Sequence, residues 1–543
     1  MIKKRINPKL GNIDPLQCGG QYNKSTSDSL FLVRATIDHS KYLNRTLYLT
    51  FYDYRTCFDS LWLEDCMISL WKIGINNDMF SLIYKMNESC EAIVKTPYGN
   101  TPPFRCPQIV KQGTVLGGSL CGSSTAELCK EIKHGGAPIL SEIIKTVLFV
   151  DDSTTANIGF NDTIDCHEKV VLFSKRKNWE LNETKCVLLV INEKKSTPPP
   201  LLYVNGHELE QVMATKLLGD ILSSDGTNNK MIDERTQKAR SATISIMSLC
   251  SDVTLGYHRV KVLCLLYAAI FLAAVLFNSQ VWSNVTTTQE KKLQTVQLKF
   301  LKRTIQAPNS TSNAFTFLEF GLLPIRYEIH KRKLMFYHHI YSLPPTDPVF
   351  RVHLEQRKLP FEKNWTNEVS ALIAAYSLEE MDISKISKGE WKKAVEENIK
   401  AVAFLALSKE CKGQTKTYNL RHQTFTPQKY LTSLSFELSS LLFKVRSKNL
   451  KCLNNHQSSS KSLICRLCDV SIETQEHIIN CKRVRGENPP INFEQFYQPY
   501  IEPNCIDIFD LIEIRDRYKL FLKLINNSDN QEGGEDVGNL VHS

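Results

Sequence analysis

Three aspartates stand where short apolar runs of the sequence end. Asp151 and Asp152 follow the run at residues 147–150, and Asp53 follows the run at residues 49–52. A short apolar run that stops at polar residues is typical of a buried strand ending at the edge of a sheet. Adjacent carboxylates repel one another unless a cation neutralises them, and a hard divalent ion such as Mg²⁺ prefers oxygen ligands. An Asp-Asp pair alone is more typical of a solvated turn, so the third aspartate is what favours a metal site.

The segments around these aspartates carry a family pattern. Residues 49–59 (Leu-Thr-Phe-Tyr-Asp-Tyr-Arg-Thr-Cys-Phe-Asp) resemble the first catalytic motif of reverse transcriptases, and residues 149–152 (Phe-Val-Asp-Asp) resemble the second. Between them, residues 111–116 (Lys-Gln-Gly-Thr-Val-Leu) resemble the element that lies under the primer and the incoming nucleotide. With the three motifs in this order, most of the chain resembles the reverse transcriptases of non-LTR (LINE-type) retrotransposons.

The resemblance implies an RNA-directed DNA polymerase, a nucleotidyltransferase. Its partners would be an RNA template, a DNA primer or target DNA, and deoxynucleoside triphosphates. Such chemistry uses two metal ions, here Mg²⁺, to activate the primer 3′-hydroxyl and to neutralise the leaving pyrophosphate. The implied ligands are Asp53 and Asp151, which would bridge the ions, with Asp152 supporting the site or binding an ion transiently. The backbone carbonyl of Tyr54 could complete a coordination shell.

Further residues take expected roles from the same resemblance. Phe58 stands where the family places an aromatic ring that excludes a ribose 2′-hydroxyl, although an ordinary core phenylalanine is the alternative. Lys111, Gln112 and Gly113 are expected to contact the template–nucleotide pair, since glycine allows close backbone approach. Lys185 stands where the family has a lysine suited to protonating the leaving pyrophosphate, and a solvated lysine is the alternative.

Residues 17–26 (Gln-Cys-Gly-Gly-Gln-Tyr-Asn-Lys-Ser-Thr) resemble the family segment that just precedes the palm. That segment is usually Gln-x-Gly-Phe followed by Arg or Lys and Ser-Thr, and here Gly20 replaces the aromatic residue. In the family a further fingers region comes before this point. The resemblance therefore implies an N-terminally truncated form with incomplete fingers and no endonuclease. A catalytically inactive relic that only binds nucleic acid is the alternative function.

A second constellation lies near the end of the chain. Cys465-x2-Cys468-x8-His477-x3-Cys481 offers three thiolates and an imidazole, which satisfy tetrahedral Zn²⁺. We therefore expect one bound zinc ion. The element resembles the Cys-Cys-His-Cys module at the C-terminus of LINE-type proteins, where it could grip template RNA or target DNA or be purely structural. The basic residues that follow at once are Lys482, Arg483 and Arg485.

The order of apolar patterns predicts an α+β fold. Strand-like and helix-like runs alternate at first, which favours a split β-α-β sheet with helices on one face, and the resemblance implies a reverse-transcriptase palm. From about residue 228 the pattern is mainly helical. The polar end of the chain from Asn526 favours disorder. We expect partial fingers and palm at 1–225, a helical thumb at 226–345, a helical C-terminal region at 346–455, the zinc module at 456–490 and a partly disordered tail at 491–543.

Four segments carry expectations about local structure. Residues 92–102 predict a strand, a Gly-Asn turn and a return strand. Residues 262–277 are uncharged and mostly apolar but shorter than the ~20 residues of a membrane span, which favours a buried helix. Residues 289–305 predict an amphipathic helix whose basic side, including Lys302, is either solvated or tracks a duplex. Residues 330–339 mix basic and aromatic side chains, as in a nucleic-acid surface or a helix with one apolar side.

The composition limits the class of protein. The chain has 543 residues, a formal net charge of +10 and 17 cysteines. Positive charge favours partners that carry phosphate without identifying them. The basic start lacks the apolar core of a secretory signal, so we expect free thiols in a reducing compartment rather than disulfides. We expect an intracellular protein of the nucleus and cytoplasm, with no membrane partner. The sequence does not specify the oligomeric state, the RNA or the target site.

Overall fold

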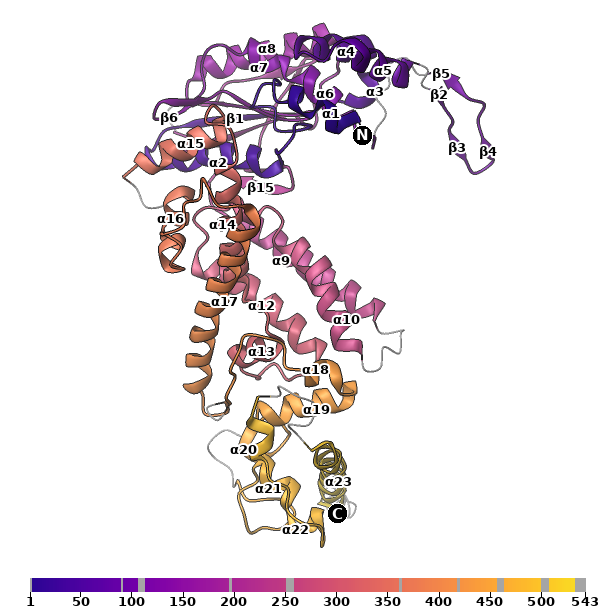
Figure 1. The fold of residues 1–543 in the computed structure, drawn as a ribbon, viewed down its shortest axis with the longest axis vertical. Helices are drawn as coiled ribbons and strands as arrows, with labels where there is room; N and C mark the ends of the chain where they lie inside the picture. Colours follow the sequence, from indigo (N-terminus) through magenta and orange to yellow (C-terminus); the bar gives the residue numbers. More distant parts are fainter. Residues whose placement is uncertain are drawn as a thin grey trace, which may run out of the picture. The chain divides into compact units, whose positions relative to one another are not determined.

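The computed structural model describes residues 2–88, 91–105, 113–194, 198–250, 258–360, 364–417, 420–456, 463–499 and 507–532 (Figure 1). Two predicted substrate-binding residues, Lys111 and Gln112, lie outside these ranges. The chain divides into two compact units. Unit 1 comprises Met1–Glu234, Phe277–Thr286 and Ile329–Val395, and unit 2 comprises Arg235–Leu276, Thr287–Glu328 and Glu396–Ser543. Each unit draws on distant parts of the sequence, whereas the predicted domains are consecutive.

Unit 1 is built on a five-stranded sheet with the strand order β13-β10-β1-β9-β8. Its central strand, β1 (Leu47–Tyr52), pairs antiparallel with β10 (Val187–Ile191) on one side and with β9 (Asp152–Asn157) on the other. β8 (Thr146–Phe149) pairs antiparallel with β9, and the short β13 (Glu210–Gln211) runs parallel to β10. The hairpin formed by β8 and β9 therefore lies directly beside the central strand.

Helices cover both faces of this sheet, which corrects the prediction of helices on one face. On one face, α8 (Phe160–Lys177) places Phe173 in a core with Tyr48 and Tyr52 of β1. On the other, α2 (Thr26–Tyr42) contacts β8 and β10 (Figure 1). All six residues of β1 are buried. A strand covered on both faces reads as a nearly continuous apolar run, and β1 is apolar at every position but Thr50, so the sequence carried a signal for two covered faces.

The remaining elements of unit 1 surround the sheet. They are α1 (Ile2–Leu10), α3 (Cys57–Ser60), α4 (Leu63–Lys72), α5 (Asn77–Glu88), α6 (Gly117–Thr125), α7 (Glu127–Glu131), β6 (Ala137–Ile139), β7 (Glu142–Ile144), β11 (Tyr203–Val204), β12 (His207–Glu208), β14 (Ala214–Leu217), β15 (Asp220–Ser223), η3 (Ser279–Val281), α15 (Pro348–Lys358) and α16 (Trp365–Ala375). Residues of both units occur in α9 (Asn229–Leu249), α14 (Ile325–Tyr341) and α17 (Lys388–Lys412).

The segment at residues 91–105 is a hairpin in two stages. β2 (Glu91–Ala92) pairs with β5 (Phe104–Arg105), and β3 (Lys95–Thr96) pairs with β4 (Gly99–Asn100). The predicted Gly-Asn turn is wrong, because these two residues open the return strand and the turn begins at Pro97. Proline presets φ for the first central position of a turn, which makes it the stronger local signal here.

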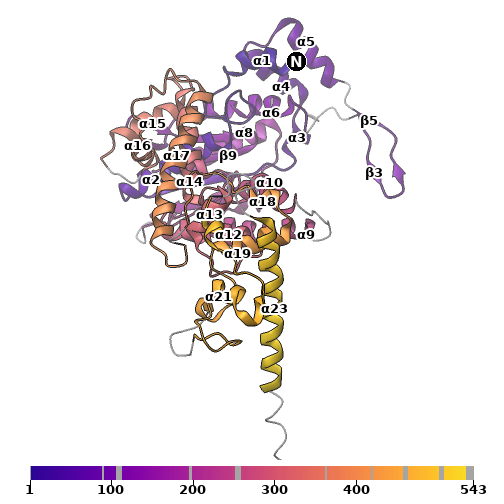
Figure 2. The same cartoon turned by 60° about the horizontal axis from the view of Figure 1, so that its bottom comes forward.

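Unit 2 is mainly helical in its described part. It contains α10 (Arg259–Leu266), η2 (Tyr267–Phe271), α11 (Leu272–Val275), α12 (Thr287–Thr304), α13 (Asn313–Phe320), α18 (Tyr430–Ser433), α19 (Phe436–Arg446), α20 (Leu453–His456), α21 (Gln475–Asn480), α22 (Lys482–Arg485), η4 (Glu494–Tyr497) and α23 (Ile508–Glu532). The long α23 packs against α19, α21 and α22 (Figure 2). Because α23 continues through Glu532, the polar segment from Asn526 begins as helix, contrary to the prediction of disorder.

The apolar segment at residues 262–277 is helical without being one regular helix. α10 passes through the π-helical turn η2 into α11. Tyr267 and Phe271 stack on each other within that turn, and both pack on Phe300 of α12. Leu265 and Ile270 are exposed, so the expected burial holds for one side of the segment only. Among the described residues, no helix is long and apolar enough to cross a membrane.

The helix predicted at residues 289–305 is α12, and its apolar side is buried as expected. Lys302, which we placed on the basic side, is buried instead. Its ammonium group donates hydrogen bonds to the carbonyls of Asn309 and Thr311 and to Oδ1 of Asn313. Lys302 therefore closes the loop after α12, and it is not positioned to track a phosphate backbone.

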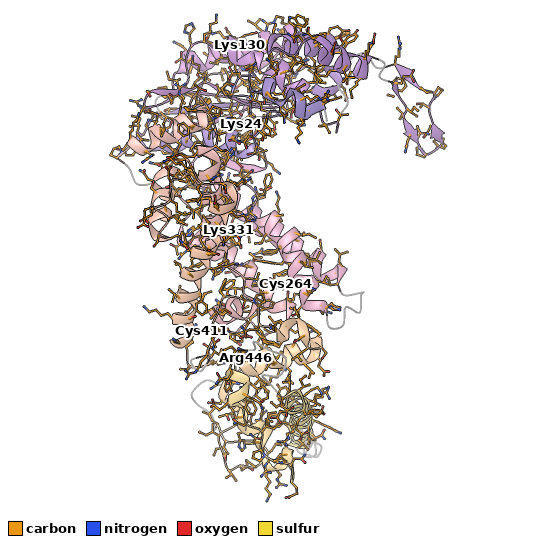
Figure 3. The ribbon with its side chains drawn as sticks, in the orientation of Figure 1. Lys24, Lys130, Cys264, Lys331, Cys411 and Arg446 are labelled. Carbon is orange, nitrogen blue, oxygen red and sulfur yellow. The ribbon has the colours of Figure 1, made fainter. Side chains whose placement is uncertain are left out.

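A buried ion pair lies inside unit 2. Glu319 of α13 accepts hydrogen bonds from the Arg446 guanidinium (2.7 Å) and the Tyr430 hydroxyl (2.5 Å), and Nε2 of His422 lies 2.7 Å from it. Arg446, labelled in Figure 3, also donates to the carbonyl of Phe496. Loss of one member would leave a buried charge unpaired, so the cluster ties α13, α18, α19 and η4 together.

Candidate active site and metal centre

The sheet brings the three predicted aspartates to one edge. In the β8–β9 hairpin Phe149 pairs with Asp152, which leaves Val150 and Asp151 as the connecting turn. The central strand pairs with β9 so that Tyr52 lies opposite Ser153. Asp53, the next residue after β1, consequently stands beside the start of β9. The sequence could place each aspartate at a strand end, and the antiparallel register makes those ends neighbours.

Burial and neighbouring charge raise the affinity of Asp151 and Asp152 for protons. Desolvation raises the pKa of Asp151, and the nearby charge of Asp53 adds to the effect. Desolvation and the charges of Asp151 and Asp53 raise the pKa of Asp152 to about 6, against the opposing effect of Lys185. The site therefore holds more negative charge than its own residues neutralise. A bound divalent cation would remove this repulsion, so the donor set fits such an ion.

Asp53 is held by two neighbours from the loop before β10. Its Oδ2 lies 3.3 Å from Nζ of Lys185 and accepts a hydrogen bond from Nδ2 of Asn182 at 3.3 Å. The backbone amide of Asn182 also donates a hydrogen bond to the backbone carbonyl of Asp53 at 2.8 Å. Lys185, expected to face the leaving pyrophosphate, thus pairs with a predicted metal ligand in this structure. Its side chain is 65% exposed, so it is free to exchange that partner for a phosphate.

The turn that carries Asp151 is gripped by Gln17. The Gln17 side-chain oxygen accepts a hydrogen bond from the Val150 amide (2.8 Å), and its side-chain nitrogen donates to the Val150 carbonyl (3.0 Å). The same nitrogen donates to the hydroxyl of Thr125 in α6 (2.7 Å), which itself donates to the Val150 carbonyl (2.7 Å). Gln17 is fully buried. One carboxamide therefore satisfies both backbone groups of the residue before Asp151.

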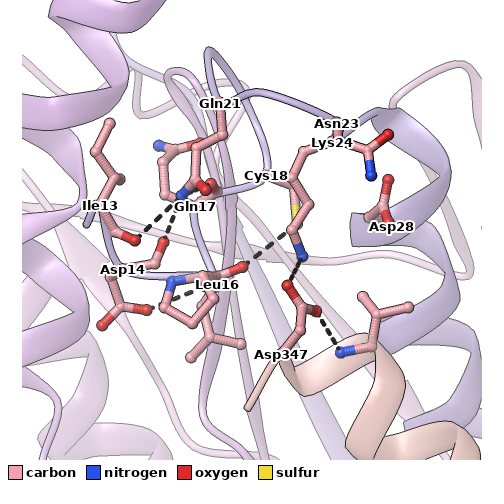
Figure 4. Close-up of polar contacts among 12 residues, drawn as sticks. Ile13, Asp14, Leu16, Gln17, Cys18, Gln21, Asn23, Lys24, Asp28 and Asp347 are labelled. Atoms are coloured by element: carbon pink, nitrogen blue, oxygen red, sulfur yellow. Dashed lines mark hydrogen bonds and ion pairs between the residues drawn. The ribbon is translucent and has the colours of Figure 1, made fainter. Parts of the chain in front are cut away.

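This grip matters because the turn is strained. Val150 has φ of +60°, a left-handed conformation that β-branched residues rarely adopt. The segment with Gln17 comes close enough only because Gly19 lacks a side chain: a Cβ there would lie 2.2 Å from the Val150 nitrogen. Gln21 braces the segment by donating to the carbonyls of Asp14 and Gln17 (Figure 4). The sequence marked Gln17 only as part of a family pattern, and the Gln-x-Gly spacing was the available signal for its role.

The other predicted substrate-binding residues occupy varied environments. Tyr54 is buried with its ring against Trp179, so only its backbone remains for the expected coordination. Phe58 in α3 is half-buried and packs against the core, which fits either a gating ring or an ordinary core residue. Gly113 has φ of +74° and open space where a Cβ would stand, so its backbone can approach a ligand.

The four predicted zinc ligands converge. The ligand atoms of Cys465, Cys468, His477 and Cys481 all lie within 4.8 Å of one another. Within the described ranges, they are the one group of three or more His, Cys, Asp or Glu side chains that does so, and the aspartate triad does not converge to this degree. Soft thiolates with an imidazole suit tetrahedral Zn²⁺. The sequence spacing found this centre because all four ligands lie within one short segment.

The residues around the thiolates hold them in place. The Cys465 amide donates to the carbonyl of Ser471, and Thr474 caps α21 by accepting from the His477 amide (3.1 Å). The buried carboxylate of Glu473 accepts from the backbone and guanidinium of Arg466. Burial raises the pKa of Cys468, but hydrogen bonds from the amides of the following turn lower it by more. The net shift of this pKa is downward and favours the thiolate. The local fold therefore organises the ligands before an ion binds.

Comparison with known families identifies the first part of the chain. Residues 1–262 match the family model described as reverse transcriptase (RNA-dependent DNA polymerase). This range contains the three aspartates, Lys185 and Gln17. Residues 1–262 are therefore similar to reverse transcriptase domains, and the described part of the chain has a mixed α+β fold. Domains of this class use divalent metal ions.

Solved structures give a weaker likeness. Telomerase from Candida albicans, in complex with a TWJ fragment of telomeric RNA, is 11% identical with a TM-score of 0.34; the match covers 71% of this chain and 57% of that one. Apo telomerase from Candida tropicalis is 13% identical with a TM-score of 0.36, over 73% and 60% of the two chains. The chain thus spans less than two thirds of these telomerase chains. No curated protein sequence matches it.

Asp152→Asn is expected to raise the melting temperature of the metal-free protein at neutral pH. The pKa of Asp152 rises from 3.8 to about 6 on folding. The contribution of the protonated Asp152 carboxyl to the free energy of unfolding is therefore fully present below the unfolded-state pKa. The folded protein loses this contribution as the pH rises through the folded-state pKa. An amide does not ionise, so the advantage of the variant should appear on going from about pH 4 to about pH 8.

Thermal melting across that pH range is the measurement, with Glu208→Gln, an exposed carboxylate on β12, as the control. Added Mg²⁺ should narrow the difference at neutral pH, because the cation stabilises the ionised carboxylates of the natural protein. An Asp152→Asn protein that melts below the natural one in metal-free buffer at neutral pH would contradict this electrostatic account.

Zinc content tests the second centre. The purified chain is expected to carry about one zinc ion, as four protein ligands complete a structural site. Cys468→Ser should lose most of the metal and destabilise unit 2, measured by atomic absorption and thermal melting. Cys452→Ser, at a buried thiol outside the cluster, should retain it. Equal zinc content in the two variants would show that the cluster is not the metal site.

Proposed function

We propose that the chain, with its reverse transcriptase domain over residues 1–262, extends a DNA primer on an RNA template as the polymerase of a LINE-type retrotransposon. The observation that carries the proposal is the set of three carboxylates that the antiparallel register brings to one sheet edge, where desolvation and neighbouring charge raise the pKa of Asp151 and of Asp152. Deoxynucleoside triphosphates would be the substrates. Copying a retrotransposon RNA at a genomic target would place the protein in the nucleus and cytoplasm.

The carboxylates would hold two Mg²⁺ ions. Asp53 and Asp151 would bridge them, Asp152 would bind one ion transiently or support its neighbours, and the Tyr54 carbonyl would complete a shell. When bound, the ions make the primer 3′-hydroxyl nucleophilic and neutralise the pyrophosphate. The residues supply a sheet edge to which the antiparallel register brings the three carboxylates. Gln17 keeps Asp151 in place while charge at the site changes.

Other residues would handle the nucleotide. Lys185 would move from Asp53 to the leaving pyrophosphate and give it a proton, since metal binding by Asp53 would weaken their ion pair. Phe58 would clash with a ribose 2′-hydroxyl and select deoxynucleotides. Gly113, together with Lys111 and Gln112, would approach the template–nucleotide pair through its open backbone.

The Cys-Cys-His-Cys cluster supports the assignment to LINE-type elements. Its four ligands converge as the zinc module of such proteins requires, and they lie C-terminal to the polymerase motifs. Lys482 and Arg483 directly follow Cys481 and are exposed. We propose that the module binds Zn²⁺ and that these two side chains contact the phosphates of template RNA or target DNA.

Primer extension tests the proposed activity. The natural chain should add deoxynucleotides to a DNA primer on an RNA template in the presence of Mg²⁺. Asp151→Asn should abolish extension, because the variant loses a charge that a metal requires. Lys185→Ala should lower kcat by about a hundredfold, the usual contribution of a general acid. Asp59→Asn, at an exposed carboxylate in nearby α3, should extend like the natural chain.

An inactive relic would give a different result. It would show no extension beside salt-sensitive binding of the primer–template, and this outcome would overturn the polymerase proposal. Extension that survives in Asp151→Asn would equally overturn it, because the activity would then come from a contaminant or from another site. Incorporation of ribonucleotides by Phe58→Ala, but not by the natural chain, would support the gating role.

A further inference from the structure

The hairpin at residues 91–105 has an edge that no other strand of the described part of the chain covers. There β2 pairs only with β5, and β3 pairs only with β4 (Figure 1). The residues of the hairpin are exposed, apart from Ala92 and Thr101, which are half-buried. A two-stranded hairpin is at best marginally stable on its own in water. A further strand laid along it would therefore stabilise it.

The two edges of the hairpin differ in what they offer a further strand. The return strand contains Pro102 and Pro103, which lack the backbone amide that a neighbouring strand needs. The first strand, residues 91–96, contains no proline, and each of its residues has an amide to donate. The edge formed by residues 91–96 is therefore the one that can accept another strand.

Hydrogen bonds inside the hairpin show which backbone groups face that edge. The Thr101 amide donates to the Val94 carbonyl (3.0 Å), and the Val94 amide donates to Oγ1 of Thr101 (3.0 Å). Val94 therefore turns its backbone groups toward the return strand. These groups alternate in direction along an extended strand, so those of Glu91, Ile93 and Lys95 face the open edge.

The open edge is complementary in charge to a second copy of itself. When two such strands run antiparallel about a twofold axis at Ile93, each Glu91 lies opposite Lys95 of the partner subunit. Both side chains are exposed, so both are accessible to a second copy. Opposite charges directly across an antiparallel pair stabilise the pair, whereas like charges destabilise it. The twofold axis repeats the favourable contact, which gives two ion pairs.

The same register covers apolar surface on both faces of the strand. Ile93 is 52% exposed and Val94 is 49% exposed, and successive side chains of a strand point to opposite faces. On one face Ile93 meets Ile93 of the partner subunit, between the two ion pairs. On the other face Val94 meets Ala92 of the partner subunit. A strand from an unrelated protein would need matching residues at each of these positions, whereas a second copy has them by symmetry.

We infer that two copies of the chain associate through the edge at residues 91–95 and form an antiparallel four-stranded sheet about a twofold axis. One strand edge is smaller than the interface of a stable dimer, so the dimer is weak and its population depends on concentration. The association needs no nucleotide transfer. It therefore goes beyond the proposed function and stands without it.

Charge reversal tests this register. Glu91→Lys and Lys95→Glu should each raise the Kd of the dimer at least about tenfold, since each change places like charges opposite one another twice. Glu91→Lys/Lys95→Glu should dimerise like the natural chain, because the pairs form again with their charges exchanged. An equimolar mixture of the two single variants should form a heterodimer, since one copy then carries two lysines and the other two glutamates.

Sedimentation velocity measures these Kd values at concentrations up to about 200 µM, where weak complexes form. The protein is treated with ribonuclease, so that bound RNA does not link two copies. Glu168→Lys and Lys175→Glu are the matched controls, because they make the same changes of net charge at exposed positions of α8 and should dimerise like the natural chain. Ile93→Lys should also prevent dimerisation, since it places two lysines opposite each other on the axis.

Three results would overturn the inference. The first is a natural chain that stays monomeric over the whole concentration range. The second is dimerisation of Glu91→Lys and Lys95→Glu with the Kd of the natural chain, or an equal loss in the α8 controls. The third is failure of both the double reversal and the mixture to restore the dimer. Because sedimentation does not depend on activity, a chain that dimerises as expected but does not extend a primer would refute the proposed function alone.

Discussion

The carboxamide of Gln17 supports the turn that carries Asp151, a proposed metal ligand. A β-branched residue in the left-handed region costs about 1–3 kcal/mol, and such a residue persists only where its surroundings hold it. Val150 is held at its amide by Gln17 and at its carbonyl by Gln17 and Thr125. Because Asp151 is the next residue, the direction of its carboxylate follows from these hydrogen bonds. The close approach of Gly19 allows this contact.

The electrostatics of the edge follow from that geometry. The hairpin turn and the end of β1 bring three carboxylates to one sheet edge, and among the described residues Lys185 is the cation that pairs with Asp53 there. The result is a site in which ionising Asp151 and Asp152 costs more free energy than ionising a free aspartate when no metal is bound. Catalytic centres that bind divalent ions are built in this way, since the repulsion that destabilises the empty site strengthens the binding of the cation. The reverse transcriptase match over residues 1–262 agrees with this chemistry.

The sequence predicted features that depend on local order and missed those that depend on distant contacts. The convergence of the four predicted zinc ligands could be anticipated because they lie in one segment, and the placement of the three aspartates at strand ends because each follows an apolar run. The helix α12 was predicted from its apolar periodicity. In contrast, the burial of Lys302 depends on a loop that folds back onto α12, and the role of Gln17 depends on contact with Val150 far along the chain. The second covered face of the sheet was missed although β1, apolar at every position but Thr50, has the pattern of a strand buried on both faces.

The division into two units likewise depends on contacts between distant residues, which the sequence did not predict. Residues 329–395 belong to the unit that holds the sheet, although more than forty residues of the other unit precede them in the chain. The amino-acid composition gives no sign that the chain returns to the first unit at residue 329. The buried pairs Lys24–Asp347 and Asp28–His339 join these distant segments, and each residue alone reads as an ordinary surface charge. Helix caps explain part of this placement, since both Asp28 and Asp347 also satisfy amides at helix starts.

The most direct measurement of the account is single-nucleotide incorporation by Gln17→Leu at saturating Mg²⁺, beside the natural chain and Gln211→Leu, an exposed residue of β13, as control. The account predicts that Gln17→Leu folds cooperatively, keeps its nucleotide KM and loses at least about tenfold in kcat, since the turn no longer fixes Asp151. Thr125→Val removes the second contact to the Val150 carbonyl and should lower kcat in the same direction. A Gln17→Leu enzyme with the kcat of the natural chain would contradict the claim that this side chain positions the catalytic carboxylate.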